Sequence, residues 1–216
     1  MDKLAELTRL EAEMAANHAL PLMEANLVFG EGDVECRVMF IGEAPGANED
    51  RLQRPFVGRG GQLLDRQIKG MGWKRADVYI TNIVKRRPPE NRDPLPEEIE
   101  AYKPYLTRQI KIIGPKVIVT LGRFAMNYFL PEAKITRDHG RVFEVGDRLV
   151  FPVYHPAAAL RSTKMMEVFC GDLKRLPAVV RGEFSPEVMA VVSSLPEARI
   201  KKKSTEPEKP SQQVLF

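Results

Sequence analysis

Short apolar runs alternate with amphipathic segments along most of this 216-residue chain, and this alternation constrains its fold more than any other feature. The runs have the β-branched and aromatic content of buried strands, and the segments between them have helical spacing or helix end signals. The expected strands are 37–42, 77–82, 116–122, 141–145 and 148–155, and the expected helices are 3–16, 60–72, 96–113, 123–130 and 172–180. Such alternation favours a mainly parallel sheet that is covered by helices on both faces.

Composition limits the partners and the compartment. Lys and Arg number 33 against 29 Asp and Glu, a net charge of +4, which permits a polyanionic partner without requiring one. Cys36 and Cys170 lie far apart and form no CxxC pair, so we expect buried free thiols and no cysteine-ligated metal. The chain shows neither a signal peptide nor an apolar run as long as a bilayer is thick, which predicts a cytoplasmic protein without membrane contact.

The domain organisation follows from a change in composition near the C-terminus. Residues 1–196 have enough apolar content for one domain with its N-terminal helix. Residues 197–216 are dominated by Lys, Glu, Pro, Ser and Gln, which bury too little apolar surface to offset the entropy of ordering. We therefore predict a disordered tail over 197–216.

Functional side chains stand where the predicted strands end. Glu43 follows the first strand within GEAPG (42–46), Asn82 ends the second, His155 ends the last before Pro156, and Phe56 lies in the loop segment PFVG (55–58). The carboxyl ends of parallel strands gather ligand-binding groups. Each residue also has an ordinary interpretation, as a solvated acid, a core ring, a turn-capping amide or a core histidine. All four ordinary interpretations would have to be true at the same time, so a shared pocket for one flat polar ring is the better interpretation.

The motifs together resemble a known family. GEAPG with Glu49-Asp50, RPFVG, TNIVK-x-RPP-x-NR-x-P and HPAA-x-LR are similar, in order and spacing, to the family 4 uracil-DNA glycosylases of bacteria and archaea, from about 27 to 176. The resemblance implies a three-layer αβα fold with a central, mainly parallel four-stranded sheet. It also implies a hydrolase of base excision repair, which removes uracil from DNA by cleaving the N-glycosidic bond.

The resemblance assigns a role to each pocket residue. Glu43 would position or polarise the hydrolytic water, and His155 would hydrogen-bond uracil O2 as the base leaves. Phe56 would stack on the extruded uracil and Asn82 would read its Watson–Crick edge. Backbone groups of Ala44 and Pro45 would line the same pocket.

Basic residues suggest where DNA binds. The basic residues that end TNIVKRR, and the arginine in the Pro-rich loop after them, are predicted to contact phosphates. In the pair that follows the HPAA turn, the leucine is predicted to enter the duplex as a wedge and the arginine to contact a phosphate. A solvated charge run and an ordinary helix start are the respective alternatives. The predicted DNA-contacting residues are Lys85, Arg86, Arg87, Arg92, Leu160 and Arg161.

The chain departs from the family at its cofactor. Family 4 enzymes usually hold an iron–sulfur cluster on four cysteines, and the corresponding positions here are near Asn17 and Leu20 and at Arg86 and Tyr102. Because such a cluster requires thiolates, we expect no iron–sulfur cluster and no metal. Leu20, Leu22 and Tyr102 are candidates for packing in its place.

The last residues suggest a protein partner besides uracil-containing DNA. Gln212, Leu215 and Phe216 form a Q-x-x-L-F ending, which resembles the short peptide by which bacterial repair proteins bind the sliding clamp. We expect a monomer in the bacterial nucleoid. Two alternatives stay open: a non-catalytic module that binds uracil in DNA, and a glycosylase for another deaminated base such as hypoxanthine or xanthine.

Overall fold

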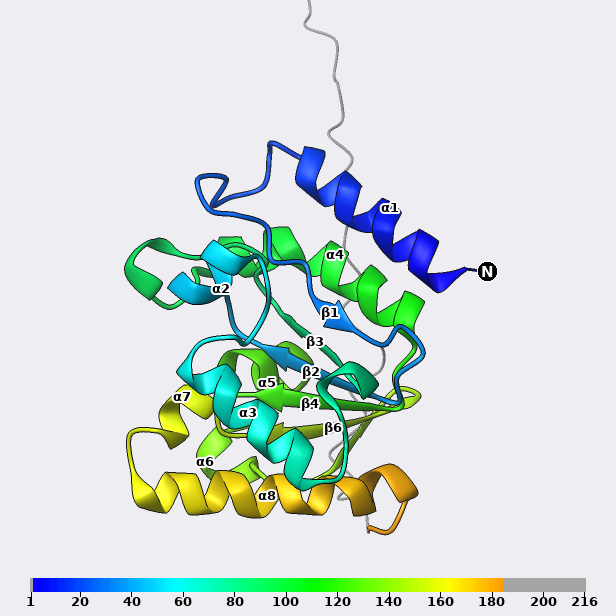
Figure 1. Ribbon diagram of the computed structural model, residues 1–216, viewed down its shortest axis with the longest axis vertical. Helices are drawn as coiled ribbons and strands as arrows, with labels where there is room; N and C mark the ends of the chain where they lie inside the picture. Colours follow the sequence, from blue (N-terminus) through cyan, green and yellow to red (C-terminus); the bar gives the residue numbers. More distant parts are fainter. Residues whose placement is uncertain (1, 185–216) are drawn as a thin grey trace, which may run out of the picture.

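The computed structural model of the protein describes residues 2–184. The predicted tail at 197–216, with the ending predicted to bind the sliding clamp, lies outside the described residues, as does the predicted domain boundary after residue 196. Within the described part the chain forms a central sheet with helices above and below it (Figure 1).

The sheet has six strands in the order β1-β3-β2-β4-β6-β5. Its centre consists of four parallel strands, as expected, and each edge adds one antiparallel strand. The parallel strands are β2 (Val38–Gly42), β3 (Tyr79–Asn82), β4 (Val117–Leu121) and β6 (Arg148–Val153). The edge strands are β1 (Glu31–Gly32), which pairs with β3, and β5 (Phe143–Val145), which pairs with β6.

Helices cover both faces of the sheet. In Figure 1, α1 and α4 lie above the strands, and α3 and α8 lie below them. The long helices are α1 (Lys3–Ala16), α3 (Arg59–Gly70), α4 (Pro96–Ile113), α5 (Arg123–Phe129) and α8 (Thr163–Arg181). Short turns of helix are α2 (Ala47–Leu52), η1 (Arg75–Asp77), η2 (Pro89–Asn91), α6 (Ile135–Asp138) and α7 (Pro156–Ala159).

The central strands are buried on both sides, and successive residues serve opposite layers. In β2, Met39 and Ile41 pack against α1 and α4, whereas Val38 and Phe40 pack against α3 and α8. Strands buried on both faces read as continuous apolar runs, which is why they were predictable. The three-layer αβα fold expected from the sequence is thus present.

Two details differ from the sequence-based expectation. The sheet has six strands where four were expected, because the short β1 carries no apolar run and the hairpin strand β5 joins the same sheet through β6. The last helix begins at Thr163, nine residues before the predicted 172–180, capped by the Ser162 hydroxyl, which accepts from the Met165 N–H at 3.5 Å. Gly171 lies inside this helix and does not break it.

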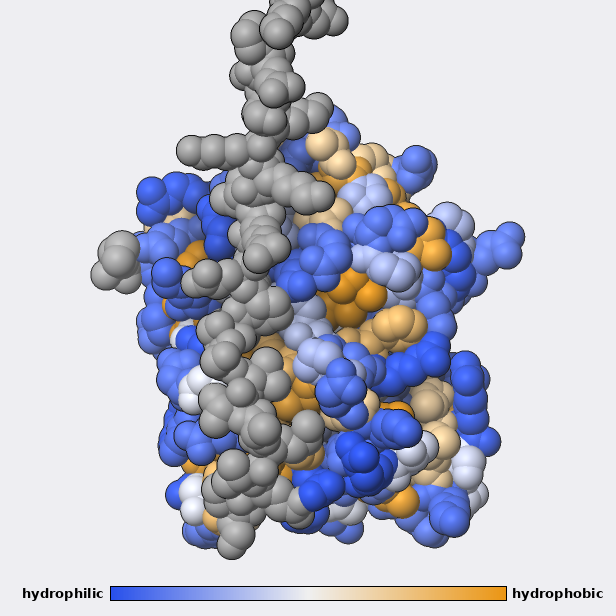
Figure 2. Space-filling view, turned by 180° about the vertical axis from the view of Figure 1, so that it is seen from behind, coloured by the Kyte–Doolittle hydropathy of each residue, from blue (hydrophilic) through white to orange (hydrophobic). Residues whose placement is uncertain are grey.

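None of the helices in the described residues has both the length and the apolar content needed to cross a bilayer. On the face seen in Figure 2, hydrophilic side chains break up the hydrophobic areas.

Candidate active site

A cavity of about 840 Å³ opens at the carboxyl ends of the parallel strands. Each of the four strands contributes to its lining: Glu43 follows β2, Asn82 ends β3, Gly122 follows β4 and His155 follows β6. Phe56 reaches the cavity from the loop before α3, and Ala44 and Pro45 line it as predicted. The fold therefore brings every predicted pocket residue to one place.

Glu43 is anchored through its backbone, and its carboxyl group is electrostatically perturbed. The Val84 N–H donates to the Glu43 carbonyl at 3.0 Å, which ties the GEAPG turn to the segment after β3. Burial raises the pKa of the Glu43 carboxyl to about 7, and the nearby Asp93 carboxylate adds to this rise. A carboxyl with such a pKa gains and loses its proton near neutral pH, which suits a general base that accepts a proton from water.

The Phe56 ring forms one wall of the cavity in an unusual backbone conformation. Its φ of 51° lies in the left-handed region, which bulky residues rarely adopt. The ring stands 5.8 Å from the His155 ring, centroid to centroid. A methyl group added to Gly42 would lie 2.4 Å from the Phe56 ring and 2.5 Å from Asn82 Oδ1, so the glycine lets these two groups meet over the end of β2.

Asn82 carries a side-chain acceptor with no partner. Its side chain is 1% exposed, and its Oδ1 has no hydrogen bond among the described residues. An unpaired buried amide oxygen costs roughly 1–3 kcal/mol, so a folded protein rarely keeps one without a purpose. The oxygen lies in the pocket beside the Phe56 ring, where a planar ligand with an N–H group would satisfy it.

His155 is held as one neutral tautomer. Its Nδ1 accepts a hydrogen bond from the Ala157 N–H at 3.2 Å, so the ring proton resides on Nε2. Burial lowers the pKa of His155 to about 4, and the positive charge of Arg161 lowers it further against the opposing effect of Glu49. The imidazole is therefore neutral at pH 7 and available as an N–H donor.

Two residues of the basic run after β3, Lys85 and Arg86, are buried. Lys85 is fully buried and donates to Thr81 Oγ1 and to Gln109 Oε1 at 2.6 Å. Arg86 is 6% exposed and donates to the carbonyl of Ala25. The phosphate contacts predicted for Lys85 and Arg86 do not fit this burial, because the chain turns into the core after β3 ends at Asn82.

The other predicted DNA-contacting residues lie near the pocket. Arg87 is half-buried and donates to Asn91 Oδ1 at 2.8 Å, and Arg92 lines the cavity while paired with Glu98. Arg161 is exposed at the rim, and Leu160 at the end of α7 is partly buried against the core. The prediction of their contacts with DNA stays a prediction.

Several lining residues were missed by the sequence analysis. Glu49 on α2 accepts hydrogen bonds from the N–H groups of Val57 at 2.9 Å and Gly58 at 2.7 Å, and so holds the loop that carries Phe56. Its position six residues after Glu43 offered only a weak signal. Arg59 and Arg123 add positive charge to the rim, and no local pattern distinguishes them from other surface arginines.

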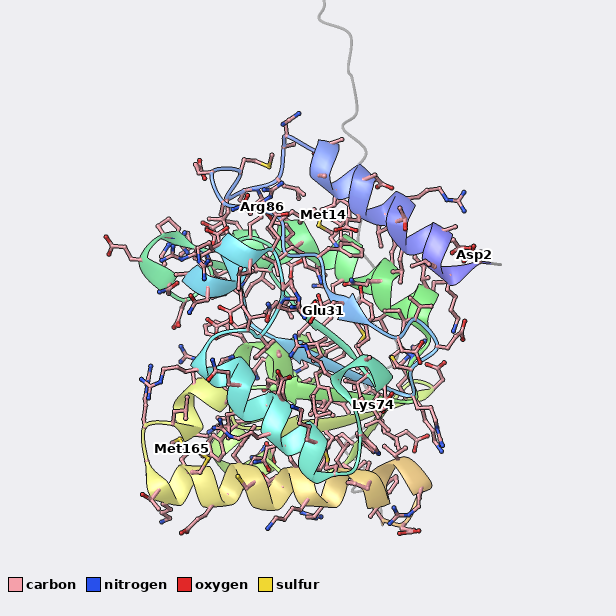
Figure 3. The ribbon with its side chains drawn as sticks, in the orientation of Figure 1. Asp2, Met14, Glu31, Lys74, Arg86 and Met165 are labelled. Carbon is pink, nitrogen blue, oxygen red and sulfur yellow. The ribbon has the colours of Figure 1, made fainter. Side chains whose placement is uncertain are left out.

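The four positions that would carry an iron–sulfur cluster hold other interactions, and one of them, Leu20, packs in the core on the α1 and α4 side. Asn17 Nδ2 donates to the hydroxyl of Tyr105 at 2.8 Å, and the buried Tyr102 donates to the carbonyl of Pro21 at 2.7 Å. Arg86, labelled in Figure 3, donates to the carbonyl of Ala25 in the same N-terminal segment. Burial raises the pKa of the Tyr102 hydroxyl, and the nearby Arg86 guanidinium opposes this rise.

The donor set does not fit such a cluster. An amide, an alkyl group, a guanidinium and a phenol supply none of the thiolates that iron–sulfur clusters require. Cys36 is buried on the α1 and α4 face, where burial raises the pKa of its thiol to about 11, and Cys170 packs against the opposite core on α8. Residues 2–184 contain no group of three or more metal-ligating side chains.

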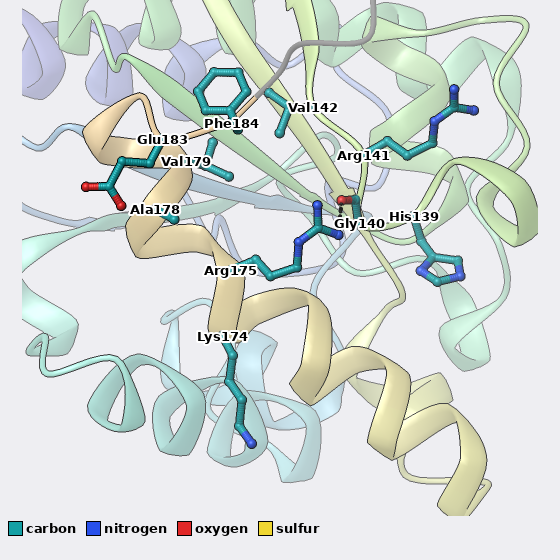
Figure 4. Close-up of a pocket in the computed structure, with 10 residues that line it drawn as sticks. All are labelled: His139, Gly140, Arg141, Val142, Lys174, Arg175, Ala178, Val179, Glu183 and Phe184. Carbon is teal, nitrogen blue, oxygen red and sulfur yellow. Dashed lines mark hydrogen bonds between the residues drawn. The ribbon is translucent and has the colours of Figure 1, made fainter.

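A second hollow, of about 640 Å³, lies between α8 and the segment 139–142 (Figure 4). There Arg175 donates to the carbonyl of Gly140 at 2.8 Å, and His139 Nδ1 lies 2.7 Å from Asp172 Oδ2. None of the predicted pocket residues lines it, so the candidate site is the cavity at the strand ends.

Comparison with known proteins agrees with this geometry. The sequence model of the uracil DNA glycosylase superfamily matches residues 29–175, which is more than half of the chain. The protein belongs to the uracil-DNA glycosylase superfamily.

Several curated relatives are type-4 uracil-DNA glycosylases. The chain is 47% identical to the type-4 uracil-DNA glycosylase of Sulfurisphaera tokodaii, over 70% of this chain and 73% of that protein. It is 38% identical to the type-4 enzyme of Thermotoga maritima, over 84% of this chain and 97% of that protein. It is 44% identical to the type-4 enzyme of Archaeoglobus fulgidus, over 71% of this chain and 81% of that protein. The superfamily match over residues 29–175 includes all six strands of the sheet and all the residues that line the cavity.

Proposed function

We propose that this protein is a uracil-DNA glycosylase, which hydrolyses the N-glycosidic bond of a deoxyuridine turned out of DNA and leaves an abasic site. The unpaired Asn82 Oδ1 beside the Phe56 ring carries the proposal. A flat ring with an N–H group at its edge satisfies both at once. Membership of the superfamily and the similarity to type-4 enzymes support the same activity.

Recognition of uracil rests on Phe56 and Asn82. The base must leave the stack at a cost of a few kcal/mol, and stacking on an aromatic ring returns ~1–3 kcal/mol. The Asn82 amide accepts from N3–H of uracil and donates to O4. Cytosine presents an acceptor at N3 and a donor at N4, so it leaves both groups of the buried amide unpaired and is disfavoured.

His155 stabilises the leaving group. As the C1′–N1 bond breaks, its electron pair passes to uracil, and negative charge develops on O2. A neutral imidazole whose Nε2–H is already oriented donates to this oxygen without prior reorganisation. Removing one such donor typically raises the barrier by ~3–4 kcal/mol.

Glu43 acts on the water. In its carboxylate form it orients a water molecule whose oxygen bonds to C1′, accepts the proton that this water loses, and stabilises the positive charge that develops on the sugar. The pKa of about 7 keeps part of the population deprotonated at neutral pH. Activity on this account increases as pH rises through that value.

The rim of the pocket supplies the DNA contacts. Arg161 and Arg59 at its edge bind phosphates in this proposal, and Arg87, Arg92 and Arg123 beside them add positive charge. Leu160 keeps part of its side chain exposed at the end of α7, next to Arg161, and so is suited to fill the space that the base leaves. Lys85 and Arg86 are left out of this interface because of their burial.

The proposed enzyme works without an iron–sulfur cluster. The contacts of Tyr102 and Arg86 with the segment 21–25 support this, because they hold the N-terminal segment without a metal. Iron in stoichiometric amount in purified protein, or absorbance near ~400 nm, would contradict it.

We also propose that the ending with Gln212, Leu215 and Phe216 binds the bacterial sliding clamp, on the strength of its sequence. Deletion of 212–216 should abolish clamp binding and leave glycosylase activity on short oligonucleotides intact. Equal clamp binding by the truncated chain would contradict this assignment.

Incubation of the full chain with an oligonucleotide that contains one U·G pair, followed by alkaline cleavage of abasic sites, tests the proposed activity. Wild type and the surface control Glu132→Gln should cleave, and Glu43→Ala and His155→Ser should each lose roughly 100-fold or more of the single-turnover rate. Tight, uracil-dependent binding without cleavage would instead identify a non-catalytic binding module. Cleavage only at hypoxanthine or xanthine would reassign the base.

A further inference from the structure

The stacking ring of Phe56 depends on a backbone that is unfavourable by itself. A phenylalanine in the left-handed region is strained, and such a conformation persists only where the surroundings determine it. The Phe56 carbonyl is packed against α3 so closely that a methyl group on Gly61 would lie 1.9 Å from its oxygen. Hydrogen bonds to the backbone around Phe56 are what can keep the strained residue in this conformation.

Arg75 supplies contacts of this kind. Its guanidinium donates to the carbonyls of Phe56 at 3.2 Å and Pro55 at 2.5 Å. The same guanidinium binds the carboxylates of Asp65 at 2.6 Å and Glu31 at 2.7 Å. Glu31, labelled in Figure 3, belongs to the edge strand β1, so the contacts of Arg75 join β1, α3 and the Phe56 loop.

The geometry makes Arg75 a fixed clamp. Its side chain is only 19% exposed, and two carboxylates orient it so that its remaining donors face the two carbonyls. Glu49 accepts hydrogen bonds from the N–H groups of the two residues that follow Phe56. Arg75 itself is not among the residues that line the pocket, so any effect it has on the bound base passes through Phe56.

We propose that Arg75 is a positioning residue that sets the Phe56 ring for stacking on the extruded base. This inference rests on the proposed glycosylase function and assigns to the η1 turn a role in substrate binding. Lysine in this place keeps the charge but, as a single point donor, does not bind two carbonyls and two carboxylates together.

Loss of the clamp should weaken base binding and spare the chemical step. Stacking acts on the bound base in both the ground state and the transition state, so its loss raises KM with little change in kcat. Stacking of one base corresponds to about 5- to 150-fold in affinity, which bounds the effect of Arg75→Lys. Phe56→Ala sets the upper limit in the same assay.

A double-mutant cycle tests the proposal. KM and kcat for U·G oligonucleotides are measured for wild type, Arg75→Lys, Phe56→Ala and the double variant, with unfolding in urea followed for each. Arg54→Lys is the matched control, because Arg54 binds the same Glu31 carboxylate without reaching either carbonyl. Asp65→Asn, which loosens the clamp and leaves Arg75 in place, is the second variant.

The expected result is a KM raised by roughly 10-fold in Arg75→Lys, a smaller rise in Asp65→Asn, no change in Arg54→Lys, and no further effect of Arg75→Lys once Phe56 is alanine. An equal effect in both backgrounds, a fall confined to kcat, or an unchanged KM would each overturn the positioning role. An inactive wild type would overturn the proposed function and the inference with it, whereas an active wild type with unaltered Arg75→Lys overturns the inference alone.

Discussion

Replacing Glu43 with glutamine tests the electrostatics of the pocket, because it removes the charge and keeps the shape of the side chain. Burial, with the Asp93 carboxylate in addition, raises the pKa of Glu43 from 4.5 to about 7. The folded protein therefore binds this proton more tightly than the unfolded chain does. Its stability falls as pH rises from 4.5 to about 7, and the full cost of the buried carboxylate is present above that range.

The size of the effect follows from the proton affinity. Each tenfold change in affinity corresponds to ~1.4 kcal/mol, and the partial exposure of the Glu43 side chain reduces the total by solvent screening. We expect Glu43→Gln to raise the free energy of unfolding by about 1–3 kcal/mol at about pH 8. That gain corresponds to a Tm higher by roughly 2–12 °C for a chain of this size. At pH 4.5, where the Glu43 carboxyl is protonated in the folded protein, wild type and Glu43→Gln should be equally stable.

Urea denaturation at a series of pH values measures this difference, with the exposed Glu132→Gln as the control for a simple change of net charge. The wild-type kcat/KM should rise with pH through about 7, while Glu43→Gln should be inactive throughout. A stability gain that is the same at every pH, or a Glu43→Gln protein less stable than wild type at about pH 8, would refute the reasoning.

Three further predictions concern the pocket and the N-terminal segment. Asn82→Ala should lower kcat/KM on uracil by roughly 10- to 100-fold and reduce the preference for U·G over C·G duplexes, because the hydrogen bonds of the buried amide to uracil are lost. An unchanged preference would contradict the proposal that Asn82 distinguishes uracil from cytosine. Nitrogen-15 NMR of His155 should show a proton on Nε2 and none on Nδ1, with protonation of the ring only near its pKa of about 4, and a doubly protonated ring near neutral pH would count against a neutral donor. Tyr102→Phe should lower the free energy of unfolding by about 1 kcal/mol and speed proteolysis within 17–26, because the bond to the Pro21 carbonyl is lost, and unaltered cleavage would show that other contacts hold the segment.

Much of the fold was predictable because the central strands are buried on both faces. Burial on both sides demands unbroken apolar runs, and those runs, with helix signals between them, are visible in one sequence. The edge strand β1 has only Glu31 and Gly32 and pairs through its backbone alone, so no side-chain pattern marks it. The first half of α8 was missed because Gly171 resembles a helix end, whereas packing on the sheet continues the helix through it.

The candidate site, like the fold, was predictable in part. Glu43, Asn82 and His155 were predictable because each follows a recognisable strand, and parallel strands bring their carboxyl ends to one edge. The sequence by itself therefore determined the layers, the order of the motifs and the placement of Glu43, Asn82 and His155 at the strand ends, since these depend on local periodicity and on residue type.

Only the tertiary structure decided which charges face DNA and which serve the core. Lys85 and Arg86 read as a basic run, yet the chain turns inward after β3 and buries both, whereas Arg75 gives no local signal and meets Pro55, Phe56 and Glu31 only after folding. The physical reason is that burial and hydrogen-bond partners depend on contacts between residues distant in sequence. The pKa values of Glu43 and His155 and the clamp on the Phe56 loop follow from those contacts.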